Sequence, residues 1–306
     1  MSDQQNNSII LCPGQGAQHV GMGKAWFEQS SVAAQTFAAA DETLGLEISK
    51  LCFEGPEDQV NRTDIAQAAI YVTSIAAYQA LAEDGKVGNI PATAGLSLGE
   101  YTALHLAGAF SFADGLKLVQ LRGQYMQEAA EASDSGMVAL IGADEDQANE
   151  LCDKARGDDV LVPANFNAPG QIVISGSSTA CERSVSVAGD MGLRATALKV
   201  AGAFHSPLMQ PAADRMADAL ESVTWSSPRI PVLSNVTGEP HSDDIEEIKK
   251  LLVQQITSPV RWVQNIQWLL ANVTGEYIEV APGKVLGGLM RRIDRGTKVT
   301  NYAVPS

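Results

Sequence analysis

The stretch Gly95-Leu96-Ser97-Leu98-Gly99 places a serine between two glycines at the spacing of a nucleophile elbow. In such an elbow a strand turns sharply into a helix, so that the hydroxyl stands clear of the backbone. A side chain two residues before or after Ser97 would crowd that turn, and glycine occupies both positions. A short apolar run (92–94) precedes the elbow and a helix-forming segment (100–107) follows it. This context favours an elbow over a chance match, and it predicts a serine nucleophile.

The surroundings of this serine predict groups that could stabilise an oxyanion. A helix beginning at Leu98 would aim its first backbone N–H groups and its positive dipole end at the serine. A glycine-rich loop (14–23) also follows a predicted strand at 8–12. The loop lacks the dinucleotide fingerprint, because His19 stands where a glycine is needed, and Met22 stands at the lysine position of a phosphate-binding loop. The loop therefore lets backbone approach another group closely without nucleotide chemistry, and one use of it would be to supply a second N–H beside the elbow.

Four histidines could act as the base for this serine. His205 lies at a predicted loop-to-helix junction, ahead of Ser206-Pro207, and follows the nucleophile as in the chain order of α/β-hydrolases. We expect His105 to lie inside the elbow helix, His241 to be solvated in a polar turn, and His19 to pack in its loop. No aspartate with a motif of its own lies between nucleophile and base, so the third member of a triad is missing.

Arg122 lies on the apolar face of a helix predicted to run from residue 112 to about 132. None of its neighbours three or four residues away is acidic, and a buried unpaired guanidinium is very costly. Two interpretations remain open. Either Arg122 pairs with a distant carboxylate or reaches water, or it binds a substrate carboxylate. The residues alone favour the structural interpretation.

The hydrophobic pattern predicts an α/β protein with an insertion. Residues 131–201 show the order β-α-β-β-α-β, which is the ferredoxin-like pattern. We predict an α/β-hydrolase-like catalytic subdomain with a parallel sheet (1–130 and 202–306) and an inserted ferredoxin-like small subdomain (131–201). Segment 165–171 is rich in turn formers and is predicted to connect two strands of the insertion, as a plain hairpin loop or facing the cleft.

The remaining elements are predicted from periodicity and end signals. Strands are predicted at 92–94, 230–233 and 277–280, and helices at 64–81 with Thr63 as N-cap, 98–107, 243–255, 261–271 and 284–292.

Composition limits the classes of function. The chain has 306 residues, 45% of them apolar, and a net charge of −15, which argues against nucleic acid and anionic membranes as partners. Its four cysteines are scattered without a Cys-x-x-Cys pair, so we expect free thiols and no metal site. Met1–Asn7 lacks the features of a signal peptide, and we expect no apolar run of the roughly 18 residues that span a bilayer. The expected location is the cytoplasm.

With these segments placed, the chain resembles the malonyl-CoA:acyl-carrier-protein transacylase family over nearly its whole length. Each motif is weak alone, but together, in order and at family spacing, they are specific. The motifs are Pro13-Gly14-Gln15-Gly16-Ala17-Gln18, Gly95-Leu96-Ser97-Leu98-Gly99-Glu100-Tyr101, Leu121-Arg122-Gly123 with Met126-Gln127, Asn165-Phe166-Asn167-Ala168-Pro169-Gly170-Gln171, Phe204-His205-Ser206, Gln255 ahead of Ser258-Pro259-Val260, and Glu279-Val280-Ala281-Pro282-Gly283-Lys284-Val285-Leu286.

The resemblance implies roles for the residues of these motifs. Ser97 would be the nucleophile and His205 its base. The backbone N–H groups of Gln15 and Leu98 would form the oxyanion hole. Gln255 would orient His205 through its backbone carbonyl, in place of the missing aspartate.

The resemblance also implies a substrate site. Arg122 would bind the malonyl carboxylate, which reverses the interpretation from the residues alone. Phe204 matches the malonyl-preferring version of its segment, Met126 would line the acyl pocket, and Asn165 would contact substrate. Many members have histidine where this chain has Leu96, a change that removes a polar contact beside the elbow.

The implied reaction moves malonyl from malonyl-CoA to the pantetheine thiol of acyl carrier protein, by a ping-pong route through a serine-linked acyl-enzyme. It would supply fatty acid synthesis, with no tightly bound cofactor, in a monomer. The alternatives are a polyketide-pathway acyltransferase, an acyl-thioester hydrolase, and a scaffold that only docks the carrier protein. The acidic carrier would dock on a basic patch, unless these residues form a solvated rim: Arg194, Lys199, Lys284, Arg291 and Arg292.

Overall fold

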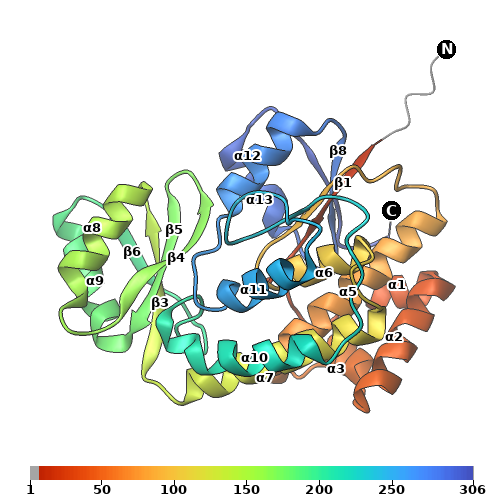
Figure 1. Ribbon diagram of the computed structural model, residues 1–306, viewed down its shortest axis with the longest axis horizontal. Coiled ribbons are helices and arrows are strands. Elements are labelled where there is room, and N and C mark those ends of the chain that lie inside the picture. Colours follow the sequence, from red (N-terminus) through yellow and green to blue (C-terminus); the bar gives the residue numbers. More distant parts are fainter. Residues whose placement is uncertain (1–6, 306) are drawn as a thin grey trace.

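The computed structural model describes residues 7–305, arranged as a mixed α/β protein around two separate sheets (Figure 1). Residues 1–6, on which the signal-peptide expectation largely rests, lie outside the described part. The larger sheet has five parallel strands in the order β7-β2-β1-β8-β9. Its strands are β1 (Ser8–Cys12), β2 (Thr93–Gly95), β7 (Val232–Leu233), β8 (Glu276–Val280) and β9 (Val299–Tyr302).

Helices surround this parallel sheet, as parallel strands buried on both faces require (Figure 1). The N-terminal helices are α1 (Lys24–Gln29), α2 (Ser31–Leu44), α3 (Ile48–Glu54), α4 (Glu57–Val60), α5 (Thr63–Glu83), α6 (Leu98–Leu106) and α7 (Phe112–Glu131). The C-terminal ones are the 3-10 turn η1 (Pro207–Met209) and α10 (Gln210–Glu221), α11 (Ile245–Gln255), α12 (Trp262–Asn272) and α13 (Val285–Ile293).

The second sheet has four antiparallel strands in the order β4-β5-β3-β6 and stands apart on the left of Figure 1. Its elements are β3 (Ser135–Ile141), α8 (Glu145–Arg156), β4 (Leu161–Ala168), β5 (Gln171–Ser177), α9 (Ser178–Asp190) and β6 (Arg194–Ala197). Helices α8 and α9 pack on each other and bury their own small core. The predicted order of elements between residues 131 and 201 is confirmed, while the exact domain boundaries stay a prediction.

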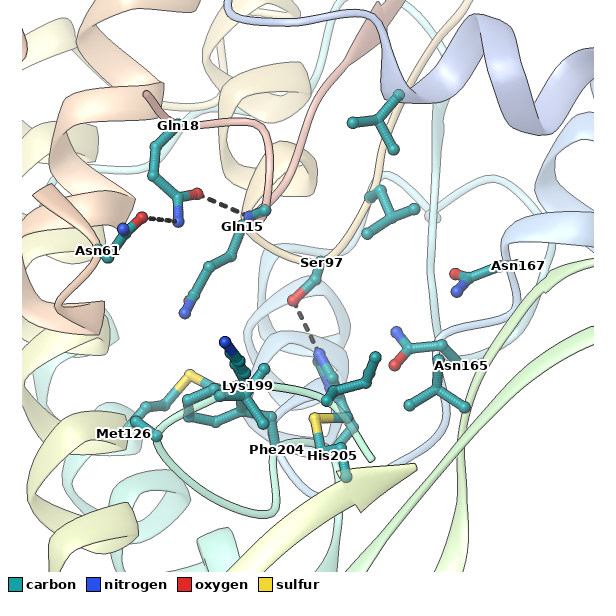
Figure 2. A pocket seen from close by; sticks show the side chains of 18 of the residues that line it. Gln15, Gln18, Asn61, Ser97, Met126, Asn165, Asn167, Lys199, Phe204 and His205 are labelled. Carbon is teal, nitrogen blue, oxygen red and sulfur yellow. Dashed lines mark hydrogen bonds between the residues drawn. The ribbon is translucent and has the colours of Figure 1, made fainter. Parts of the chain in front are cut away.

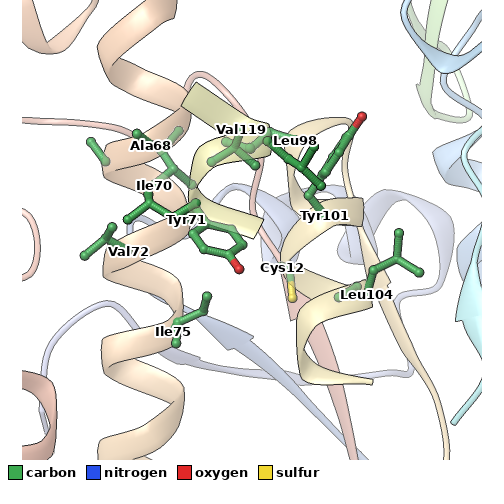
Figure 3. Packing of buried hydrophobic residues seen from close by; sticks show 14 of the residues in the cluster. Cys12, Ala68, Ile70, Tyr71, Val72, Ile75, Leu98, Tyr101, Leu104 and Val119 are labelled. Atoms are coloured by element: carbon green, nitrogen blue, oxygen red, sulfur yellow. The ribbon is translucent and has the colours of Figure 1, made fainter. Parts of the chain in front are cut away.

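The main core lies between the sheet and helices α5, α6 and α7, where Tyr71, Leu98 and Val119 pack together (Figure 3). By length and composition alone, α5 could cross a membrane, so the expectation that no such run exists is wrong for this helix. However, 78% of its apolar 18-residue window is buried inside the protein. Since α5 packs against α2 and α7, its apolar surface forms core.

Several predicted boundaries are corrected. Strand β4 continues to Ala168, so the expected connection shrinks to a turn at Pro169-Gly170, and the amides before it belong to a strand. Ladder bonds with β5 override the local turn propensity there. Thr63 is the first residue of α5 instead of its N-cap, and β9 was not predicted.

Candidate active site

Ser97 lies at the turn between β2 and α6 with a strained backbone, φ 52° and ψ −103°. A Cβ on Gly95 would lie 1.8 Å from the carbonyl carbon of Gly99, and a Cβ on Gly99 would lie 2.1 Å from the carbonyl oxygen of Cys12. Only glycine fits at both positions. The steric expectation for an elbow is therefore confirmed.

Parallel strands place the site residues along one edge of the large sheet. Ser97 follows β2, Gln15 follows the neighbouring β1, and Asn235 follows β7 on the other side. These three strands are adjacent and parallel, so the segments after their carboxyl ends meet above the same edge. This is where open α/β sheets commonly bind ligands.

Ser97 and His205 form a hydrogen-bonded pair, with 2.9 Å between Oγ and Nε2 (Figure 2). On the far side of the ring, Nδ1 lies 2.7 Å from the backbone carbonyl oxygen of Gln255. A carbonyl only accepts, so Nδ1 donates to it and the neutral ring keeps a lone pair on Nε2. The hydroxyl of Ser97 therefore donates to His205. His205 also has a positive φ of 59°, which marks a second strained residue in the site.

The electrostatic surroundings keep His205 neutral. Burial lowers the pKa of His205 to about 4, and the nearby positive charge of Arg122 acts in the same direction. A neutral imidazole is the form that can take a proton from Ser97. The pair is therefore ready for nucleophilic attack at neutral pH.

Arg122 is 1% exposed, and its guanidinium donates to the Ser97 hydroxyl oxygen at 3.0 Å. Its other acceptors are the side-chain amide oxygens of Gln67 at 2.6 Å and Gln255 at 2.8 Å. Within residues 7–305, no carboxylate forms an ion pair with Arg122, and its side chain does not reach water. The fold thus gives Arg122 neither the distant carboxylate partner nor the access to water that the structural interpretation requires.

The two predicted oxyanion donors come from different segments: Gln15 follows β1, and Leu98 directly follows Ser97. Leu98 is the first residue of α6, so its N–H has no partner inside the helix. Gln15 lines the cavity, with its side chain held by Thr63 Oγ1 at 3.2 Å. The N–H of Ser97 itself is occupied, since it donates to Asn235 Oδ1 at 2.6 Å. The N–H of Ser97 is therefore not available to an oxyanion.

Gln15, Ser97, Arg122 and His205 line a cavity of about 740 Å³ between the two sheets. The predicted substrate residues Met126, Phe204 and Asn165 all line it (Figure 2). Leu96 lines it too. Gln255 is fully buried behind the wall. Of the proposed docking residues, only Lys199 reaches this cavity. The described residues hold no group of three or more His, Cys, Asp or Glu side chains placed for a metal ion.

Sequence reasoning missed the polar groups that support the elbow. Asn235 accepts from the Ser97 N–H and donates to the Gly95 carbonyl at 2.8 Å, so one amide spans the turn. Glu100 is fully buried and accepts from the backbone N–H of Asn235 and from the Gln255 amide. In the sequence, Asn235 is a polar residue after a predicted strand, and Glu100 is a polar residue directly after the elbow. Both features are too common to single these residues out.

The prediction for the exposure of His241 is wrong. This residue was expected to be solvated, but its side chain is buried and its Nε2 lies 2.6 Å from a carboxylate oxygen of Glu100. The polar turn around it folds back against β7, where the N–H of His241 donates to the carbonyl of Val232. Tertiary pairing therefore outweighs the polar composition of this turn. His105 lies inside α6 as expected and is half-buried, with Nδ1 3.1 Å from the Phe110 carbonyl oxygen.

Comparison with known proteins places this geometry in a family. Residues 9–302 match the acyl transferase domain model. The malonyl CoA-acyl carrier protein transacylase of Bacillus subtilis is 41% identical over 97% of this chain and 93% of its own length. The crystal structure of the corresponding enzyme from Xanthomonas oryzae pv. oryzae superposes with a TM-score of 0.94 at 38% identity, covering 99% of this chain and 96% of the other.

A third similar structure is a malonyl transacylase in complex with the acyl-carrier protein of a type II polyketide system, with a TM-score of 0.93 at 35% identity, covering 98% of this chain and 96% of the other. The predicted family resemblance is confirmed, and the chain belongs to the malonyl-CoA:acyl-carrier-protein transacylase family of acyl transferase domains.

Proposed function

We propose that this protein transfers a malonyl group from malonyl-CoA to the pantetheine thiol of an acyl carrier protein, through an ester on Ser97. The observation that carries this proposal is the guanidinium of Arg122, buried without a carboxylate partner and 3.0 Å from the nucleophile. A carboxylate on the acyl group supplies the missing negative charge. The names of its relatives, which are malonyl transacylases, support the same substrate.

The first half-reaction acylates the serine. His205 Nε2 takes the proton as Ser97 Oγ attacks the thioester carbonyl. The oxyanion accepts hydrogen bonds from the N–H groups of Gln15 and Leu98, each typically worth about 3 kcal/mol. The carbon–sulfur bond then breaks, and the imidazolium of His205 returns its proton to the departing coenzyme A thiolate.

The second half-reaction is the reverse sequence with a new thiol. The pantetheine thiol of the carrier gives its proton to His205, and its sulfur attacks the serine ester. Collapse of the oxyanion breaks the bond to Ser97 Oγ, which regains a proton from the imidazolium. A thiolate is a good leaving group, so a base held by a carbonyl instead of a carboxylate is sufficient.

The finer predictions belong to the same proposal. We assign the product to fatty acid synthesis, and the similar enzyme bound to a polyketide carrier makes polyketide synthesis the alternative. We also propose a cytoplasmic monomer without a tightly bound cofactor. Its α/β-hydrolase-like core spans 1–130 and 202–306 and its ferredoxin-like subdomain spans 131–201.

One experiment separates transfer from the alternatives. The protein is incubated with malonyl-CoA, Ser97 is examined by mass spectrometry, and holo-carrier protein is then added. A malonyl adduct on Ser97 that moves to the carrier supports the proposal. Release of free malonate before the carrier is added identifies a hydrolase. Absence of an adduct, in a sample where Ser97→Ala behaves identically, identifies a non-catalytic scaffold.

A further inference from the structure

The acceptors around Arg122 are neutral, which is unusual for a buried guanidinium. Charged groups that are fully buried are normally paired with an opposite charge. Here the amide oxygens of Gln67, from α5, and Gln255, from the end of α11, hold the guanidinium at 2.6 and 2.8 Å. Both glutamines are almost completely buried. These contacts therefore fix the orientation of Arg122 without placing a carboxylate in direct contact with its guanidinium.

Gln255 also separates Arg122 from the buried carboxylate of Glu100. The Gln255 amide nitrogen donates to Glu100 Oε2 at 2.7 Å, while its amide oxygen accepts from Arg122. The second oxygen of Glu100 is bonded to His241. A carboxylate is thus present in the network, but one amide group stands between it and the guanidinium.

Gln67 accepts from the other terminal nitrogen of the Arg122 guanidinium. Its amide nitrogen lies 3.5 Å from Met126 Sδ, a weak acceptor, so the stronger contact is the one from its oxygen to Arg122. The side chain of Gln67 therefore has one strong hydrogen-bonding partner, the guanidinium.

We propose that Gln67 is a specificity-determining residue, whose neutral amide positions Arg122 while leaving its positive charge for the carboxylate of an acyl group. This inference rests on the proposed function and deepens it. A glutamate at position 67 would have nearly the same shape but would pair with Arg122 internally. The substrate carboxylate would then have to compete with a preformed ion pair.

Two substitutions separate charge from shape. Gln67→Glu keeps the acceptor and adds a negative charge, which stays ionised beside a guanidinium. Gln67→Met keeps the length and neutrality of the side chain but removes the acceptor. Gln35→Glu, at an exposed position of α2, controls for the added charge alone.

The first measurement is kcat/KM for acylation of Ser97 by malonyl-CoA and by acetyl-CoA. Gln67→Glu should lower the malonyl-to-acetyl ratio by about 100-fold or more, as expected when a charge interaction is neutralised. Gln67→Met should lower it by about 10-fold or less, and Gln35→Glu should not change it. An unchanged ratio in Gln67→Glu, or an equal fall in both Gln67 variants, overturns the proposal.

The second measurement does not depend on malonyl chemistry. Acylation of Ser97 by neutral p-nitrophenyl acetate is followed as a function of pH. The charge of Arg122 lowers the pKa of His205. Pairing Arg122 with a glutamate should therefore move the acid limb of the pH–rate profile to higher pH, whereas Gln67→Met should leave this limb in place. An unmoved limb in Gln67→Glu contradicts the inference. If the wild type takes no malonyl group, the proposed function fails, and this limb still decides the role of Gln67.

Discussion

Gln255 serves His205 with its main chain and Arg122 with its side chain. Its carbonyl oxygen accepts from His205 Nδ1 at 2.7 Å, and its amide oxygen accepts from Arg122 at 2.8 Å. One residue therefore fixes both the base and the cation of the site. Because the two contacts use different atoms, substitution of the side chain can remove one and retain the other.

Gln255→Ala should impair malonyl recognition more than the nucleophile. The backbone carbonyl that orients His205 remains, so acylation by p-nitrophenyl acetate should fall by less than about 10-fold. Loss of the amide frees Glu100 to pair with Arg122, so kcat/KM for malonyl-CoA should fall by about 10- to 100-fold. Equal losses with both substrates would show that the side chain is needed for the base itself.

Arg122→Ala should abolish the preference for a carboxylate. We expect acylation by malonyl-CoA to fall by about 100-fold or more, and acylation by acetyl-CoA to be retained or to rise, because no unpaired guanidinium then penalises a neutral acyl group. Steady-state rates with both thioesters measure this. An equal loss with malonyl-CoA and acetyl-CoA would contradict the carboxylate role.

His205 should stay deprotonated well into the acid range, so the rate of acylation should persist there. His205 accepts a proton only when neutral, and its pKa is about 4. Acylation of Ser97 should therefore be nearly independent of pH between about 5.5 and 7, and should fall as the pH drops through about 4. The rate of acylation by p-nitrophenyl acetate in short incubations tests this. An acid limb near 6.5, the ordinary value for histidine, would be inconsistent with a buried, neutral base.

The same pKa affects stability. The folded pKa of His205 is lowered from its model-peptide value of 6.5 to about 4, so the unfolded chain binds the extra proton first as the pH falls. The free energy of unfolding should therefore decrease between about pH 6.5 and 4, by about 3 kcal/mol from this group. Denaturant titrations of wild type and His205→Gln measure the difference. The variant should lose this part of the pH dependence, and parallel curves would argue against it.

Gly99→Ala should destabilise the elbow. The new Cβ would lie 2.1 Å from the carbonyl oxygen of Cys12, so backbone must move, at a cost of about 1–3 kcal/mol or more. Gly288→Ala in α13 is the control, since its Cβ would meet no atom within 4 Å and alanine favours helix. Thermal unfolding should show a lower midpoint for Gly99→Ala and an equal or higher one for Gly288→Ala. Equal midpoints in the two variants would contradict the steric argument.

Local signals were sufficient for much of the fold. The apolar run of β1, the start of α6 at Leu98 and the start of α7 at Phe112 were predicted from neighbouring residues, because each depends on side chains within a few positions. Predictions failed where contacts between residues far apart in the sequence determine the local structure. The extension of β4 to Ala168 comes from its ladder with β5, and the burial of His241 comes from its contact with Glu100.

The strand-turn-helix of the elbow and the order of elements in the insertion could be predicted from the sequence, since these follow from spacing and hydrophobic period. The family was indicated by the resemblance of several short motifs that occur in order along the chain. The tertiary structure decided which polar groups surround Ser97: His205, Arg122 and Asn235 come from separate segments of the chain. It also decided that the acceptors of Arg122 are the amides of Gln67 and Gln255. The physical reason is that periodicity reports which face of an element is buried, whereas a hydrogen-bond partner depends on how helices and loops far apart in the chain pack together.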